Sequence, residues 1–71
     1  MSTPENLSAT QAASLLIEHG HATFDTAEDM LARLSRVNGP SLVCQRPEHQ
    51  VYLRYEGDGL WVRIDVLPEH A

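Results

Sequence analysis

Aromatic rings and guanidinium groups are combined in the C-terminal half of the chain, at Tyr52, Arg54, Trp61 and Arg63. Tyrosine, tryptophan and arginine are enriched at the energetic centres of protein–protein interfaces. In the strand register preferred below, all four side chains lie on one sheet face, opposite most of the aliphatic side chains. We predict that this face binds a protein partner or forms the seam of a homodimer. The alternatives are ordinary strand residues on a solvated sheet, or a face covered by the N-terminal segment.

The histidines and the single cysteine are the other residues that could do chemistry. His19, His21, Cys44 and His49 show none of the short paired spacings that zinc sites use, so we predict no metal site and no cofactor. Cys44 and His49 flank a predicted turn, but burial of the thiol would keep it protonated and inert. No motif of a catalytic serine, a zinc protease or a nucleotide-binding loop occurs. We therefore predict that the protein is not an enzyme.

Composition narrows the class of protein further. The chain has 71 residues, which is one domain at most. Ten acidic and five basic side chains give a formal net charge of −5, which makes nucleic acid an unfavourable partner. All five cations are arginines, so Schiff-base chemistry and a phosphate-binding lysine are excluded. A small dimeric regulator of the helix-turn-helix type, binding nucleic acid, is the alternative function, because two consecutive helices are predicted.

Neither a membrane span nor a secretion signal is predicted. The longest aliphatic run, residues 15–17, is far below the roughly 18 residues that a membrane helix needs. The N-terminus has no basic segment followed by an apolar one. Cys44 is alone, whereas small secreted domains usually depend on disulfides. We expect a cytoplasmic protein without membrane contact.

The first helix has a clear start signal. Ser8 and Gln11 have the spacing of a capping box, which predicts a helix from about Ala9 to His19 that Gly20 ends. Residues 1–6 are polar, and we predict that they form a flexible tail.

The spacing of apolar residues predicts a second helix. Side chains repeat at helical spacing over residues 27–37, after a second capping box formed by Asp25 and Glu28. Residues 38–40, with sequence Asn-Gly-Pro, end the helix. Residues 21–24 are either a short extra strand or an extended connection.

Beyond Pro40 the periodicity changes from helical to alternating. The pattern predicts three antiparallel strands in a meander, at residues 41–46, 51–56 and 60–66. The last two strands are joined by a two-residue turn at Gly57-Asp58 or at Asp58-Gly59. We prefer the first turn, because the second would place Arg54 opposite Arg63.

Both turns give the same two faces. The predicted core face consists of Val51, Leu53, Tyr55, Val62, Ile64 and Val66, joined by Leu42 and Cys44.

The predicted fold is a two-layer α+β domain over residues 7–67, in which two N-terminal helices pack on one face of a three-stranded antiparallel meander. Residues 68–71 are expected to form a C-terminal tail. The predicted function is that of a small non-catalytic interaction module of the inhibitor, immunity, adaptor or antitoxin type.

Overall fold

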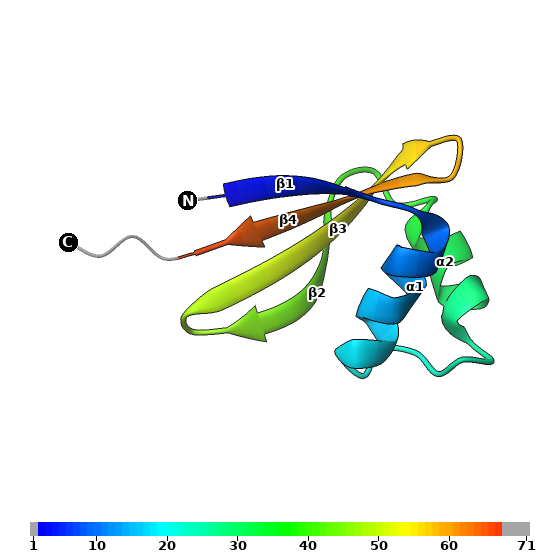
Figure 1. Ribbon diagram of the computed structural model, residues 1–71, viewed down its shortest axis with the longest axis horizontal. Coiled ribbons are helices and arrows are strands. Elements are labelled where there is room, and N and C mark those ends of the chain that lie inside the picture. The colour runs from blue at the N-terminus through cyan, green and yellow to red at the C-terminus, as the bar shows by residue number, and fades with distance from the viewer. Residues whose placement is uncertain (1, 68–71) are drawn as a thin grey trace.

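The fold is a four-stranded antiparallel sheet with two helices on one of its faces (Figure 1). The computed structural model describes residues 2–67, so the predicted tail at residues 68–71 lies outside the described part. The order along the sheet is β1 (Ser2–Leu7), β4 (Leu60–Val66), β3 (His49–Gly57) and β2 (Ser41–Arg46). The helices α1 (Ala9–Glu18) and α2 (Ala27–Leu34) follow β1 in the sequence.

The prediction of three strands is wrong, because β1 is formed from residues that were expected to be a flexible tail. Its backbone pairs with β4 from Ser2 opposite Val66 to Leu7 opposite Trp61. A strand at the edge of a sheet needs only one paired side, and Leu7 alone of its described side chains is buried. Residues 2–6 are polar and therefore did not show the pattern of a strand. The strand that they form is held to β4 mainly by backbone pairing.

The predicted start of α1 is confirmed. The Ser8 hydroxyl accepts a hydrogen bond from the backbone N–H of Gln11 at 3.3 Å, and the Gln11 side chain accepts one from the backbone N–H of Ser8 at 2.9 Å. The buried side of α1, which includes Ala12 and Leu16, packs against β1 and β4. This helix is the one that anchors the helical layer to the sheet.

The second helix starts later and is shorter than predicted. Its N-cap is Thr26, which makes no capping hydrogen bond to the helix, so the predicted capping box at Asp25 is wrong. The Thr26 hydroxyl instead accepts from the backbone N–H of Thr23 at 2.8 Å. Residues 21–24 belong to this tight connection and do not form a strand. Ala27 and Leu31 form the buried side of α2, which packs mainly against α1.

The predicted register between β3 and β4 is also wrong. Asp58 and Gly59 have φ values of 54° and 73°, as the less favoured type I′ turn requires. A β-bulge between Tyr55 and Gly57, where Gly57 has a φ of 94°, adds one residue to β3. Tyr55 therefore faces Trp61 instead of Leu60, and every side chain of β4 changes face.

The core consequently differs from the predicted one in β4. Trp61, only 2% exposed, joins Leu53 and Val51 beneath the helices. Ile64 and Val66, which were predicted to be core, are half-buried on the opposite face of the sheet. Val62 lies on that face too, but it is only 5% exposed, so its predicted burial is confirmed. A further bulge in β2 lets Val43 enter the core beside Cys44, while Leu42 is 40% exposed.

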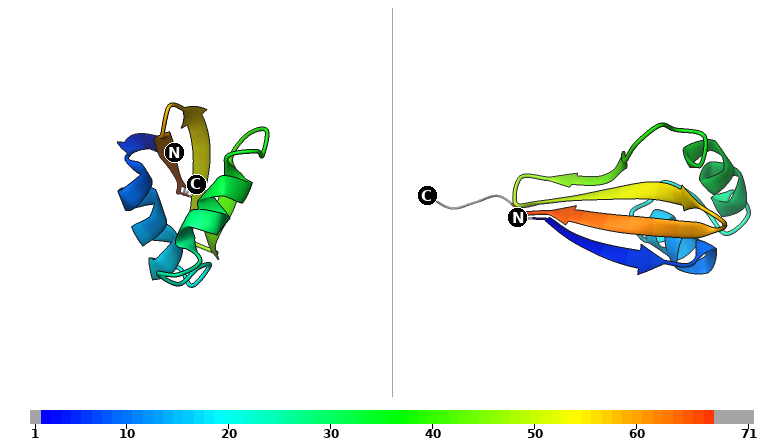
Figure 2. Two further views of the ribbon diagram at one scale, coloured as in Figure 1. Left: turned by 90° about the vertical axis from the view of Figure 1, so that its right-hand side faces the viewer. Right: turned by 90° about the horizontal axis from the view of Figure 1, so that it is seen from above.

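The helices cover only one end of the sheet (Figures 1 and 2). The strand ends near the β2–β3 turn extend past them. The outer strands are β1, which contains Pro4, and β2, in which the ring of His21 contacts the carbonyl oxygen of Val43 through Nε2. Both edges thus differ from a regular open strand.

Candidate functional site

The four residues predicted to bind a partner do not share a face. Trp61 and Arg63 lie on the side of the sheet that carries the helices, because they pair opposite Tyr55 and Leu53. Tyr52 and Arg54 lie on the opposite side, which we call the open face. The bulge at Gly57 separates the two pairs, so the predicted arginine–aromatic face is split.

Trp61 is part of the core. Its ring centroid is 4.8 Å from that of Tyr55, and the two planes are inclined at 51°. The Tyr55 hydroxyl accepts a hydrogen bond at 3.0 Å from the backbone N–H of Gly59, in the hairpin turn. Tyr55 therefore contacts both Trp61 in the core and the turn of the β3–β4 hairpin.

The open face consists of a polar column beside an apolar one. The polar column runs along β3, and the pairing of the two strands places the apolar column of β4 directly beside it. The polar column contains Gln50, Tyr52, Arg54 and Glu56, and the apolar column contains Val62, Ile64 and Val66. On the other side of the polar column, Leu42 of β2 pairs with Tyr52.

Two hydrogen bonds connect side chains within the polar column. Arg54 donates from Nη2 to Oε1 of Glu56 at 2.7 Å, and the Tyr52 hydroxyl donates to Oε1 of Gln50 at 3.3 Å. The ion pair is 40% and 37% exposed at its two side chains, so water screens it and it adds little stability. Nε of Arg54 is covered and has no hydrogen-bond partner among the described residues. A binding partner cannot reach this covered atom, but the Arg54 side chain as a whole is 40% exposed.

The open face is neutral although the protein is acidic. Its two charged side chains are Arg54 and Glu56, which sum to zero. The other four arginines and nine carboxylates of the chain account for the whole net charge of −5. An approaching surface would therefore meet apolar and neutral polar groups here.

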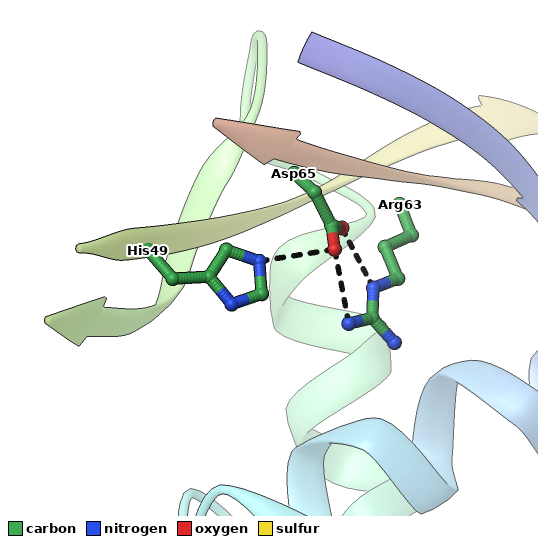
Figure 3. A network of polar contacts seen from close by, with 3 residues as sticks. All are labelled: His49, Arg63 and Asp65. Atoms are coloured by element: carbon green, nitrogen blue, oxygen red, sulfur yellow. Dashed lines mark hydrogen bonds and ion pairs between the residues drawn. The ribbon is translucent and has the colours of Figure 1, made fainter. Parts of the chain in front are cut away.

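A polar cluster lies on the helix side of the sheet, and its Arg63 borders α1 (Figure 3). Arg63 donates from Nε and Nη2 to the two oxygens of Asp65, at 2.7 and 3.1 Å. His49 contacts the same carboxylate through Nε2 at 3.1 Å. We call these three residues the Asp65 cluster.

The charges of the Asp65 cluster stabilise one another. Burial disfavours the Asp65 carboxylate, but the hydrogen bonds from Arg63 and His49 outweigh it, so the pKa of Asp65 is lowered. The hydrogen bond to Asp65 raises the pKa of Arg63, against the opposing effect of burial. Both groups are therefore charged at neutral pH.

The Asp65 cluster lacks the nucleophile of a hydrolytic triad. A histidine oriented by an aspartate is one part of such a triad, which also needs a serine, threonine or cysteine in contact with the histidine. None of the hydrogen bonds in the described part of the chain joins His49 to such a side chain. Over residues 2–67, no group of three or more His, Cys, Asp or Glu side chains is arranged to hold a metal ion.

Sequence reasoning missed the Asp65 cluster. Arg63 and Asp65 stand two positions apart on one strand, a spacing that indicates a shared face and could have revealed their contact. His49 could not be assigned in this way, because its position opposite the end of β4 depends on the bulge. The apolar column was recognised as a column but was assigned to the wrong face.

Comparisons with known proteins leave the function to be inferred from the residues themselves. Neither the models of protein families, nor the curated proteins, nor the solved structures gave a match to this chain. No helix in the described range is long and apolar enough to cross a membrane.

Proposed function

We propose that the protein is a small non-catalytic interaction module that binds a protein partner through its open face. One observation carries this proposal. Two half-buried aliphatic side chains, Ile64 and Val66, lie beside Tyr52 and Arg54 on the sheet face opposite the helices, in line with Val62, which is only 5% exposed. An apolar patch beside tyrosine and arginine on a small domain is typical of an interaction site.

The chemistry of the partner follows from the two columns. Its surface should be flat, to match a sheet, and should place apolar side chains over Ile64 and Val66. It should also present a carboxylate or carbonyl oxygen to the guanidinium of Arg54, whose side chain is 40% exposed. Inhibitors, immunity proteins, adaptors and antitoxins are classes of small protein that act by such contacts alone.

Catalysis and nucleic-acid binding have less support. The Asp65 cluster holds its charges in mutual contacts and has no described nucleophile beside it. For a helix-turn-helix role, the first turn of α2 would approach phosphates with Glu28 and Asp29, both acidic. The interaction class is therefore the one that the geometry favours.

Site-specific photo-crosslinking tests the proposal. A photoreactive phenylalanine analogue is placed at position 52, on the open face, in the full chain, and the crosslinked protein from a lysate of the source cell is identified. The same analogue at Val37, which is 46% exposed on the segment after α2, is the matched control. Capture from position 52 alone supplies the partner for measurement with purified proteins.

The affinity of the purified partner decides the outcome. Ile64→Arg and Arg54→Ala should each weaken binding at least about 30-fold, as expected for residues at the centre of an interface. Arg46→Ala, which removes an exposed arginine of β2, should change the affinity less than about threefold. A partner that binds all three variants with equal affinity would refute the proposal.

A further inference from the structure

The outer surface of the helix pair contains an apolar groove. Its volume is about 270 Å³, and it runs between α1 and α2. Its walls are largely small or aliphatic side chains: Ala9, Ala13 and Ile17 from α1, and Ala27 and Leu31 from α2. Alanines on both sides let another backbone approach closely. The two helices that line the groove lie on the side of the sheet away from the open face (Figure 2).

Phe24 stands at the rim of this groove and is the most exposed large apolar side chain of the described part of the chain. Its exposed fraction is 89%, against 40–46% for the other four exposed large hydrophobic residues. Burial of a phenylalanine side chain is favourable, and this protein leaves the ring of Phe24 almost fully exposed. A partner that occupies the groove could bury the Phe24 ring.

The connection between the helices fixes the position of Phe24. Thr23 accepts hydrogen bonds through its carbonyl from the N–H groups of Thr26 and Ala27, at 3.2 and 2.9 Å. Its own N–H donates to the Thr26 hydroxyl at 2.8 Å. Phe24 is therefore presented by a turn that is closed by hydrogen bonds, and little conformational freedom is lost when it is bound.

The charge around the groove is negative, which favours a basic binding partner. Glu28 lines the groove and Asp25 follows Phe24 directly, whereas no cation is among the described residues that line it. Arg33, the nearest cation of α2 in sequence, lines a separate hollow with His21 and Met30. A second copy of this chain fits poorly, because a two-fold axis beside Phe24 would bring the acidic residues of both copies together.

We propose that the groove between α1 and α2 is a second docking site, which takes the apolar face of a basic amphipathic helix from a partner protein. The leucine-like side chains of that helix would lie along Ala13 and Leu31 and against Phe24. Its arginine or lysine side chains would meet Asp25 and Glu28. The complex would be a three-helix arrangement, and the open face would remain free for the partner proposed above.

An NMR titration of the full chain tests this site with synthetic helices. One peptide has a leucine face and an arginine face, and its matched control carries glutamate at the arginine positions. The arginine peptide should give saturable shifts at the amides of Ala13, Ala27 and Leu31, with an affinity at least about tenfold above that of the glutamate peptide. Equal affinity of the two peptides, or shifts confined to the open face, would overturn the proposal.

Substitutions separate the groove from the open face. Phe24→Ser should weaken the arginine peptide roughly tenfold or more, while Val37→Ser, at another exposed apolar residue, should leave its affinity unchanged. Glu28→Lys should weaken the arginine peptide severalfold and Asp58→Lys, in the β3–β4 turn, should not.

The open-face variant Ile64→Arg makes failure of the two proposals distinguishable, because it should leave peptide binding intact. Loss of peptide binding in this variant, or affinity unchanged by Phe24→Ser, would contradict the assignment of the groove. Shifts at the groove residues that depend on protein concentration alone would show self-association there instead and would also overturn it.

Discussion

The two faces of β4 lie on the opposite sides of the sheet from those that their amino-acid compositions predict. The face with three aliphatic side chains, Val62, Ile64 and Val66, is the open one. The face with Trp61, Arg63 and Asp65 carries the helices, although two of its three side chains are charged. Counting apolar residues therefore does not identify the face that carries the helices, although Val62 on the open face is itself only 5% exposed.

The difference arises from where the helices end along the strand. They cover the end of the sheet that holds Trp61, whose large ring meets Tyr55 and the leucines of the core. Further along β4, Arg63 lines a hollow with Ser14 and Glu18 of α1, and Arg63 and Asp65 remain 29% and 19% exposed in their ion pair. At this end of β4 both Trp61 and Val62 are buried, at 2% and 5% exposure, whereas the residues further along the strand are half-buried on both faces.

Removal of the Trp61 ring should have the largest effect. Trp61→Ala should lower the free energy of unfolding by about 3–5 kcal/mol, because it leaves a cavity against Tyr55 and Leu53. In a domain of this size such a loss approaches the whole stability. Urea denaturation followed by circular dichroism measures it. Tyr52→Ala on the open face is the control, and a loss as large as that of Trp61→Ala would contradict the assignment of the two faces.

The bulge at Gly57 should have the next largest effect. Gly57→Ala should cost about 1–2 kcal/mol, because a φ of 94° is unfavourable for a residue with a Cβ, although there is space for that atom. Thermal unfolding checks this value.

Deletion of Gly57 is the informative companion. It removes the extra residue of β3 while leaving the turn at Asp58 and Gly59, so Tyr55 should still face Trp61. The tryptophan fluorescence should then stay at the wavelength of a buried ring. A shift towards the wavelength of an exposed ring would show that the bulge does not set the register in this way.

The Asp65 cluster should contribute about 1 kcal/mol at neutral pH, as a hydrogen-bonded charge on a part-buried face. Because the pKa of Asp65 is lowered by folding, this contribution is present above the ordinary aspartate pKa of about 3.9 and is lost as pH falls through the lower folded value. Asp65→Asn should therefore lower the free energy of unfolding at pH 7 and have little effect at the acid end of the transition. A pH-independent difference between variant and wild type would show that the carboxylate charge is not responsible.

The smallest effect on stability is expected at the open face. Val66→Thr, which replaces a methyl group by a hydroxyl on a half-buried side chain, should change the free energy of unfolding by less than about 0.5 kcal/mol. The same measurement on Leu53→Thr, in the core, supplies the contrast. A comparable loss at both positions would mean that the apolar column is covered in solution.

The sequence carried enough information for the helices and for three of the strands. The capping box of Ser8 and Gln11 is a local signal, and it was confirmed to the atom. The register of β4 could not be obtained in this way. Gly57 is compatible with a turn or with a bulge, and the alternation of apolar and polar residues does not distinguish the two. β1 escaped prediction since its polar residues are held by backbone pairing with β4, which no local pattern reports.

The predicted site was divided by the same bulge. Tyr52 and Arg54 were placed together on one face, as predicted from their spacing within a single strand. Their relation to Trp61 and Arg63 depended on the pairing of two strands, and one extra residue reversed it. Spacing within a strand is therefore a safer guide to a site than proximity across a hairpin.

The two outer strands bear on how the protein behaves when it is crowded. Amyloid fibrils grow when chains add strands to a flat edge whose backbone groups are free. In this protein Pro4 has no N–H to offer at one edge, and at the other edge the bulged Val43 carbonyl already has the ring of His21 as its partner. Concentrated solutions of the folded protein should therefore resist fibril growth, and loss of either device should shorten the lag time before fibrils form.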